Sequence, residues 1–319
     1  MQADLEKVSV VVPLLDEVES LEELHKKVTE AFKGRFEPEL IFVDDGSRDG
    51  SWDVIEKLSK QYSHVKGIRF RRNYGKSTAL HHGFANATGA YIATMDADLQ
   101  DDPLEIPLMI DQLNEQGLDL VSGWKQNRQD PITKTVPSRF FNFVTRVVTG
   151  IQLHDFNCGL KVYRKEVVER LELYGERHRY IPLLANWEGY HKIGEKPVKH
   201  HERKYGKSKF GISRFINGFL DLITLMFVNY YLQRPMHFFG TAGIVSVFFG
   251  SLITAYLVFM RIFHDEFLSR RPLLLFGILL ILIGFQFFSI GLFGEMMVRH
   301  RRDTKPVSIG ETTNIIDTE

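Results

Sequence analysis

The sequence of 319 residues has a single cysteine, Cys158, and therefore cannot form an intramolecular disulfide. Its 40 Lys and Arg residues balance 40 Asp and Glu residues, so the net charge gives no indication of a nucleic-acid partner. The N-terminal stretch MQADLEKV is charged and does not have the pattern of a secretory signal peptide. These absences are compatible with a reducing compartment and give no support to a nucleic-acid substrate.

Several common nucleotide and metal motifs are also absent. Gly75-Lys76-Ser77 resembles the end of a phosphate-binding P-loop, but Phe70 stands where that motif needs its first glycine. No G-x-G-x-x-G follows the first predicted strand, which argues against a dinucleotide-binding fold. Asp96-x-Asp98-x-Gln100 begins like a calcium loop, but Pro107 stands where that loop needs its bidentate glutamate. A nucleotide or metal site in this chain must be of another kind.

Two long stretches lack charged residues altogether, at 235–260 and 272–294. As helices they would be roughly 35–39 Å long, whereas the hydrocarbon core of a bilayer is about 30 Å thick. We therefore predict two transmembrane helices, since two buried core helices are a poorer interpretation at this length. Lys and Arg flank both runs on their outer sides, so the positive-inside rule places both flanks in the cytoplasm.

Residues 210–233 are also largely apolar and could form either a third span or a helix at the membrane surface. A third span would bury Asp221 in the bilayer at a cost of ~2.5–3.5 kcal/mol, so we predict an amphipathic helix at the membrane interface instead. The predicted domains are a cytoplasmic domain at 1–209, this interfacial helix, a transmembrane pair at 234–298 and a cytoplasmic tail at 299–319.

The first domain alternates apolar strand patterns with helix patterns. The predicted strands are 8–13, 40–43, 65–70 and 90–95, and the predicted helices are 20–32, 51–62 and 76–87. Ser20 and Glu23 have the spacing of a capping box for the first helix. The alternation predicts an α/β fold with a mostly parallel sheet that is covered on both faces. Ligands of such sheets bind beyond the carboxyl ends of the strands, where three polar clusters occur: Pro13–Glu17, Asp44–Ser47 and Asp96–Gln100.

The stretch MDADLQDDP places four aspartates within seven residues. Asp96 and Asp98 flank one alanine, and continued strand geometry would point both side chains to one side. Two such carboxylates suit Mg²⁺ or Mn²⁺, which leaves coordination positions for water and diphosphate oxygens. The alternative is a plain acidic turn. We assign Asp101 or Asp102 to the N-cap of a helix with Pro103 at its first position.

Six stretches occur in a specific order: VVVPLLDEVESL, VDDGSRDGS, RNYGKSTAL, MDADLQDDP, DFNCGLKVYRKEV and ERKYGKSKF. Together they resemble the polyprenyl-phosphate glycosyltransferases of glycosyltransferase family 2. These enzymes have a Rossmann-like GT-A domain and are relatives of dolichyl-phosphate mannose synthase and of bacterial bactoprenol glucosyltransferases. The resemblance covers nearly the whole chain, the two C-terminal spans included. It implies inverting transfer of a sugar from a nucleotide sugar to a lipid phosphate.

The resemblance also implies roles for individual residues. The nucleotide would be bound by Pro13, Leu15, Glu17, Asp44, Asp45, Ser47, Asn73 and Lys76. The metal and the diphosphate would be bound by Asp96, Asp98 and Gln100. The acceptor phosphate would be bound by Lys125, Lys134, Ser138, Arg139, Arg203 and Lys207. The alternatives are a simple Asp-Gly turn at Asp44–Ser47 and an anionic-lipid patch for the basic residues.

A phosphate monoester is largely ionised near pH 7, so such an acceptor needs cations to bring it close to the donor more than it needs a strong base. Asp155 remains open between a weak catalytic base, a ligand for a sugar hydroxyl and a structural carboxylate. We predict that glucose passes from UDP-glucose to undecaprenyl phosphate at the inner membrane, with Mg²⁺ or Mn²⁺ as cofactor. The alternatives are another donor (GDP-mannose, UDP-GlcNAc or an amino sugar), a processive polysaccharide synthase and a non-catalytic scaffold. The resemblance makes a homo-oligomer, such as a tetramer, plausible.

Overall fold

The computed structural model describes residues 5–126, 142–202, 204–205, 235–264 and 272–302, together with positions 224 and 226. The chain divides into two compact units, Met1–Phe219 and Leu220–Glu319. Each unit is described by itself. The predicted interfacial helix at 210–233 lies outside the described residues except at those two positions, and the finer domain boundaries stay predictions.

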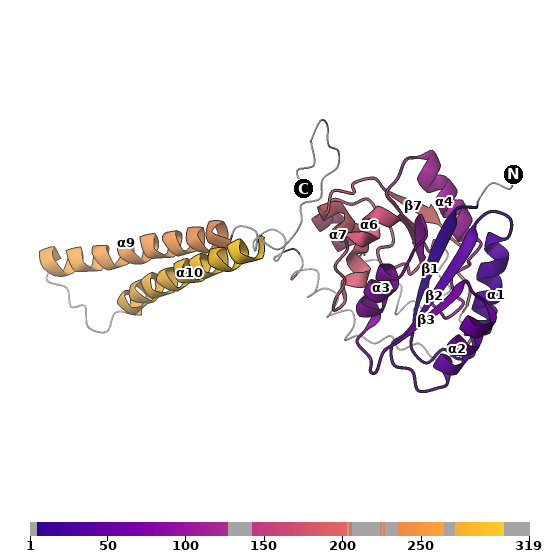
Figure 1. Ribbon diagram of the computed structural model, residues 1–319. Helices are drawn as coiled ribbons and strands as arrows, with labels where there is room; N and C mark the ends of the chain where they lie inside the picture. Colours follow the sequence, from indigo (N-terminus) through magenta and orange to yellow (C-terminus); the bar gives the residue numbers. More distant parts are fainter. Residues whose placement is uncertain are drawn as a thin grey trace, which may run out of the picture. The chain divides into compact units, whose positions relative to one another are not determined.

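Within the described part of the first unit, seven strands form one sheet in the order β3-β2-β1-β4-β6-β5-β7. Figure 1 shows β1, β2 and β3 side by side. The strands are β1 (Lys7–Leu14), β2 (Glu37–Asp44), β3 (Val65–Arg69), β4 (Tyr91–Thr94), β5 (Leu120–Trp124), β6 (Lys161–Arg164) and β7 (Ile193–Pro197). Strands β3, β2, β1 and β4 run parallel to one another, and β7 is parallel to β5. Only β6 among these seven is antiparallel to its two neighbours.

The described helices of this unit are α1 (Leu21–Phe32), α2 (Ser51–Gln61), α3 (Lys76–Ala85), α4 (Glu105–Glu115), α6 (Lys165–Glu169), the 3₁₀ helix η1 (Arg177–Tyr180) and α7 (Ile181–Trp187). A further short helix covers residues 142–149. The predicted mostly parallel sheet is confirmed, as are the four predicted strands and the three predicted helices.

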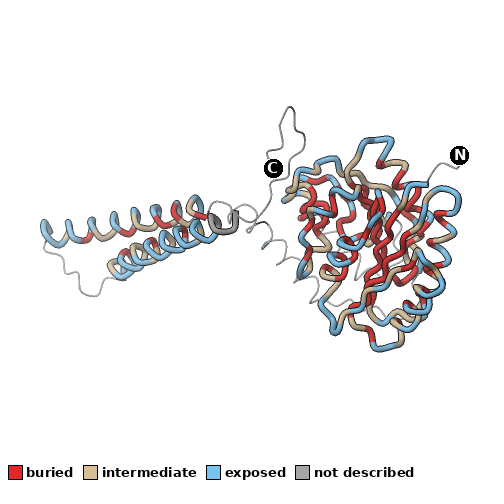
Figure 2. The backbone as a smooth tube through the Cα atoms, viewed as in Figure 1, coloured by how far each residue is buried: buried red, intermediate tan, exposed pale blue. Residues whose placement is uncertain are grey.

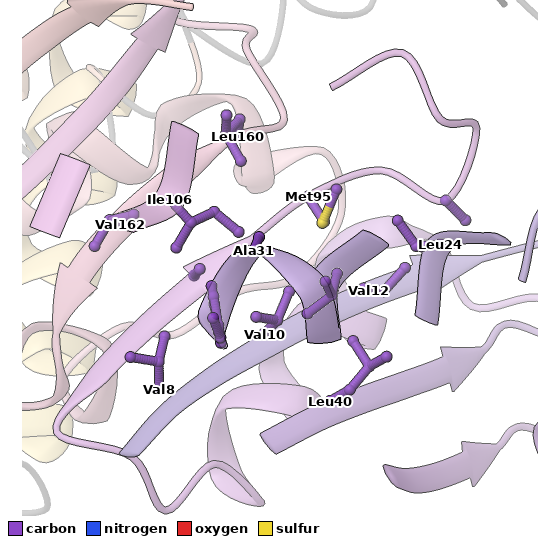
Figure 3. Close-up of a cluster of buried hydrophobic side chains, with 14 of the residues drawn as sticks. Val8, Val10, Val12, Leu24, Ala31, Leu40, Met95, Ile106, Leu160 and Val162 are labelled. Carbon is purple, nitrogen blue, oxygen red and sulfur yellow. The ribbon is translucent and has the colours of Figure 1, made fainter. Parts of the chain in front are cut away.

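The alternating side chains of β1 explain why both faces of the sheet are covered. Val8, Val10 and Val12 point into the main core, together with Leu24 of α1 and Ile106 of α4 (Figure 3). Val11 points to the opposite face, where α3 packs so closely that a Cβ on Gly83 would lie 2.2 Å from the Val11 side chain. A strand buried on both faces must be apolar at every position, as this one nearly is.

Two helix starts differ from the predictions. The Ser20 hydroxyl donates to the Glu17 carbonyl (2.9 Å) and makes no capping bond to α1, so the predicted capping box is wrong. Helix α4 begins at Glu105, two residues after Pro103, and Asp102 Oδ1 accepts a hydrogen bond from the Leu104 N–H (3.1 Å). The Asp102 carboxylate therefore closes the turn before the helix and does not cap it.

The second unit is a pair of packed apolar helices. A π-helical turn, η2 (Met236–Gly240), leads into α9 (Thr241–His264), and the second helix is α10 (Pro272–Arg302). Glycines let the two backbones approach closely: a Cβ on Gly250 would lie 2.6 Å from the Gly277 carbonyl oxygen. Most other side chains on both helices are exposed, and many of these are large and apolar (Figure 2). Both helices are long and apolar enough to cross a membrane, as predicted.

Candidate active site

The three predicted polar clusters lie at one edge of the sheet. Strand β1 pairs with β2 on one side and with β4 on the other, and all three are parallel. Their carboxyl ends therefore meet, and the segments that follow them carry Pro13–Glu17, Asp44–Ser47 and Asp96–Gln100. This edge is where ligands of open parallel sheets bind.

The segment after β1 is held by the turn after β2. Ser47 Oγ accepts a hydrogen bond from the Asp16 N–H (2.9 Å), and Ser51 Oγ accepts one from the Glu17 N–H (3.1 Å). Asp44 Oδ1 accepts the Ser47 N–H (2.8 Å) and closes the turn itself. Gly46 has a φ of 83°, and a Cβ on it would lie 2.8 Å from the backbone of residue 72. Residues Asp44–Ser47 do form a turn, and this turn orders the segment after β1. Whether it also binds the nucleotide stays a prediction.

Asp45 holds a third segment in place. Its two carboxylate oxygens accept hydrogen bonds from the Tyr74 N–H (2.7 Å) and the Gly75 N–H (2.9 Å). Burial raises the pKa of Asp45, although these two N–H groups act in the opposite direction. The bonds fix the loop that contains the exposed Asn73 and leads to Lys76. Asp45 was predicted to contact the nucleotide, and the structure shows it ordering the loop that carries two other predicted ligands.

Asp96 contacts a lysine and lies close to a glycine. The Lys76 ammonium contacts the Asp96 carboxylate, whose side chain is 34% exposed. Thr94 Oγ1 donates to the Gly159 carbonyl (2.8 Å), and a Cβ on Gly159 would lie 2.7 Å from Asp96 Oδ2. A glycine at this position therefore leaves room for the carboxylate, and a positive charge already lies beside it.

Asp98 and Gln100 follow in a tight turn. The prediction that Asp96 and Asp98 point to one side required strand geometry to continue, but strand β4 ends at Thr94. The turn that follows includes Leu99, whose φ is 61°. Asp98 is almost fully buried, and its Oδ1 accepts the Gln100 N–H (3.2 Å). In the described part of the chain, no three His, Cys, Asp or Glu side chains converge on a closed metal site. An ion held by Asp96 and Asp98 alone would take much of its coordination from water and phosphate oxygens.

An unpredicted ion pair involves the next residue of this loop. Asp101 Oδ1 lies 2.8 Å from Lys125 Nζ and 3.9 Å from His200 Nδ1. Burial alone would raise the pKa of Asp101, but Lys125 and His200 outweigh it and hold that pKa well below its usual value. Burial alone would lower the pKa of Lys125, and the Asp101 carboxylate raises it above its usual value. Asp101 is therefore the partner of Lys125 and not a helix cap.

Lys161, on β6, is a second buried cation that was not predicted. Its ammonium contacts the Cys158 carbonyl, and burial lowers the pKa of Lys161. Asp155 and Asp96 act on it electrostatically, which places it among the carboxylates of the site. Burial also raises the pKa of the Cys158 thiol to about 12, and this side chain is part of the hydrophobic core. The sequence signal was a lone lysine inside the apolar run GLKVY.

Asp155 is buried in a turn beside this cluster. Its N–H donates to Glu195 Oε1 (3.0 Å), and its own Oδ1 accepts the Asn157 N–H (3.1 Å). The preceding His154 stacks on Trp124 at 4.3 Å, and its Nδ1 lies 2.7 Å from Glu195 Oε2. The Asp155 carboxylate therefore accepts a hydrogen bond within this turn, and its catalytic alternatives remain predictions.

The structure tests only part of the predicted acceptor site. Lys125 is among the described residues, and its ammonium forms an ion pair with Asp101. The other predicted acceptor residues lie outside the described residues: Lys134, Ser138, Arg139, Arg203 and Lys207. One contact beside Lys76 was not predicted. Ser77 Oγ accepts a hydrogen bond from the His178 N–H (2.9 Å) and lies 3.0 Å from His178 Nδ1.

Comparisons with known proteins agree with this geometry. Residues 9–172 match the model of the family described as "Glycosyl transferase family 2". The "Dodecaprenyl-phosphate galacturonate synthase" of Rhizobium johnstonii is 38% identical over 308 residues, which cover 94% of this chain and 90% of that protein.

Solved structures show the same fold. Glucosyl-3-phosphoglycerate synthase from Mycobacterium tuberculosis, in complex with Mn²⁺, UDP-glucose and glycerol 3-phosphate, superposes with a TM-score of 0.53 at 19% identity. The match covers 70% of this chain and 80% of that one. A complex of the same enzyme with Mn²⁺, UDP and glucosyl-3-phosphoglycerate also gives a TM-score of 0.53, at 18% identity and with the same coverage.

Proposed function

The chain belongs to glycosyl transferase family 2, and from that premise we propose that it transfers a sugar from a nucleotide sugar to a polyprenyl phosphate. The observation that supports the proposal most is the contact of the Asp96 carboxylate with the Lys76 ammonium, at the carboxyl edge of the sheet. The neighbouring loops are ordered by hydrogen bonds to Asp45 and Ser47. The relative named as a dodecaprenyl-phosphate galacturonate synthase supports a lipid phosphate as acceptor. The two apolar C-terminal helices would keep the enzyme at the membrane, with its first unit on the cytoplasmic side.

The charges of the site suit two anionic substrates. The Asp96 carboxylate contacts the Lys76 ammonium, and it also acts electrostatically on the buried ammonium groups of Lys125 and Lys161. A divalent cation on Asp96 and Asp98 would neutralise negative charge on the leaving diphosphate. We propose Mg²⁺ or Mn²⁺ in this role, with Asp98 as the first ligand.

The residues of the chain position the two reactants. Lys76 contacts Asp96 and is partly exposed, so it can exchange this contact for a donor phosphate. The ordered loops at Leu15–Glu17 and Asp44–Ser47 would bind the nucleoside. The acceptor phosphate carries its own negative oxygen and attacks the anomeric carbon from the side opposite the leaving diphosphate, which inverts the configuration. Basic side chains that hold this phosphate near the donor supply the proximity that the reaction needs.

We propose glucose, carried by UDP, as the donor sugar, on the resemblance to the bactoprenol glucosyltransferases. Galacturonate is the second candidate, because the 38% identical relative is named for that sugar. The two differ at C6, where the uronate has a carboxylate and glucose has a neutral hydroxymethyl group. A pocket built for one discriminates against the other, because it leaves a charge or a polar group without a partner.

The test is a transfer assay with the full chain purified in detergent. Undecaprenyl phosphate is offered with labelled UDP-glucose, UDP-galacturonate, UDP-GlcNAc or GDP-mannose, each with Mg²⁺, with Mn²⁺ and with EDTA. We expect one donor to label the lipid, and we expect both EDTA and Asp98→Ala to lower the rate at least ~100-fold. Glu105→Gln is the matched control, since this buried carboxylate forms an ion pair with Lys196 and lies outside the proposed metal site. Bound nucleotide without transfer from any of these donors would favour the scaffold.

A further inference from the structure

The first turn of α3 carries Lys76 and has no side-chain cap of its own. The residue before the helix is Gly75, which has a φ of 92° and no side chain that could accept a hydrogen bond. The N–H groups of a first helical turn have no partner within the helix, and such ends are prone to fray. Lys76 contacts Asp96 and, in the proposed function, meets the donor diphosphate. Whatever holds this turn in place therefore also determines the position of the Lys76 ammonium.

Two distant side chains hold the residues on either side of Lys76. On the N-terminal side, the Asp45 carboxylate accepts the two N–H groups that precede Lys76 (2.7 and 2.9 Å). On the C-terminal side, Ser77 Oγ accepts the His178 N–H (2.9 Å) and lies 3.0 Å from His178 Nδ1. The Ser77 side chain is fully buried, and both of its hydrogen-bond contacts among the described residues are to His178. A buried hydroxyl is costly without a partner, so this turn depends on His178.

His178 belongs to an element that is itself well anchored. The 3₁₀ helix η1 ends at Tyr180, which is fully buried, and leads directly into α7, where Ile181 and Leu183 are also buried. The contact with Ser77 joins residues that are 101 positions apart in the sequence. Because His178 offers both a backbone N–H and a ring nitrogen to one hydroxyl, it ties the start of α3 to a part of the fold that is distant in the sequence.

We propose that Ser77 and His178 are positioning residues for the donor diphosphate. By fixing the first turn of α3, they hold the Lys76 ammonium where it can pass from Asp96 to the diphosphate of the nucleotide sugar. In this role both residues act through Lys76 and not by touching the diphosphate. The inference rests on the proposed function and adds to it a link between the donor site and η1.

The experiment measures the binding of UDP, with Mn²⁺ present, to the full chain in detergent by isothermal titration calorimetry. It compares Ser77→Ala, Lys76→Met and the variant that carries both changes. We expect Ser77→Ala to weaken UDP binding ~3–10-fold, about the effect of one lost hydrogen bond. The double variant should bind UDP no more weakly than Lys76→Met alone, because the effects of two residues that act through one contact do not add.

Thr78→Ala is the matched control. It also removes a hydroxyl from the first turn of α3, but Thr78 Oγ1 donates to the Tyr74 carbonyl (3.2 Å) and not to η1, so UDP affinity should not change. His178→Leu should weaken UDP binding as Ser77→Ala does, whereas His178→Asn should restore it, because the amide can meet the same hydroxyl. In transfer assays Ser77→Ala should raise the KM for the nucleotide sugar and leave the KM for undecaprenyl phosphate unchanged.

Several results would overturn the proposal: additive losses in the double variant, unchanged UDP affinity in Ser77→Ala, an equal loss in Thr78→Ala, or no UDP binding by the unsubstituted chain. Should Ser77→Ala fail to fold, His178→Leu combined with Lys76→Met tests the same link. A chain that binds UDP in a Ser77-dependent way but transfers no sugar would contradict the proposed function and leave this positioning role intact.

Discussion

At the scale of single residues, the most informative contact is that of Gly159 with Asp96. A side chain on Gly159 would enter the space that the carboxylate occupies, because its Cβ would lie 2.7 Å from Asp96 Oδ2. The glycine is held there by the bond from Thr94 to its carbonyl. One hydrogen atom in place of a methyl group therefore decides whether the proposed metal ligand can adopt its position.

Gly159→Ala should accordingly lower kcat at least ~10-fold, because misplacing a reacting or metal-binding group by about 1 Å is costly. Steady-state transfer kinetics measure this effect. Gly194→Ala on β7 is the control, since its Cβ would meet only flexible side-chain ends, those of Leu118 and Gln112. Similar kinetics for the two variants would show that Asp96 is not held in a required position.

From the sequence, a residue's role could be predicted only where its side-chain chemistry and its local position indicated that role. Asp96 stood out as one of several carboxylates at a strand end, and the structure gives it a cation partner. The pairing of Asp101 with Lys125 could not be foreseen, because 24 residues separate them and their contact depends on the turn after β4 and the end of β5. Local sequence suggested a helix cap for Asp101, and the long-range ion pair overrides it.

At the scale of elements, Glu39 joins three neighbouring segments at the amino edge of the sheet. This carboxylate on β2 accepts hydrogen bonds from Ser9 on β1 and from Thr88, and it pairs with Lys66 on β3. Burial alone would raise the pKa of Glu39, but these partners outweigh it and lower the pKa to about 2. The ionised group therefore stabilises the folded chain.

A depressed pKa fixes the direction of the pH dependence. The Glu39 carboxylate binds a proton more tightly in the unfolded chain than in the folded chain. Its contribution to the unfolding free energy is therefore complete above the ordinary pKa of 4.5 and is lost as the pH falls towards about 2. Glu39→Gln should lower the unfolding free energy at pH 7 by about 3 kcal/mol. The difference in unfolding free energy between the variant and the unsubstituted chain should shrink as the pH falls below ~4.5. Thermal midpoints measured across this range check it, and a gap that is constant with pH would contradict the assignment.

The elements themselves were largely predictable. A short apolar run such as that of β1, followed by a helix pattern, favours a strand buried on both faces. The pairing of β6 between β4 and β5 was not predictable, because an antiparallel strand inserted into a parallel sheet depends on contacts distant in the sequence. That insertion is what brings Gly159 and Lys161 to the site.

At the scale of the whole molecule, the C-terminal unit depends on close backbone contact between α9 and α10. Gly250→Ile should force these helices apart, because a Cβ there already lies 2.6 Å from the Gly277 carbonyl oxygen. Overpacking of this kind costs about 1–3 kcal/mol and should lower the thermal midpoint of the full chain in detergent. Phe249→Ile, at the exposed neighbouring position, is the control. Equal midpoints for the two variants would show that the helices do not pack as described.

The central claim also concerns the whole molecule: we propose that this chain transfers a sugar to a polyprenyl phosphate. Mass spectrometry of the lipid product tests it most directly, after incubation with undecaprenyl phosphate, Mn²⁺ and an equal mixture of UDP-glucose and UDP-galacturonate. Our account predicts a lipid heavier by a single hexosyl residue, and a hexuronosyl residue in its place would assign the second candidate sugar. A lipid of unchanged mass, under conditions in which UDP binds, would contradict the account.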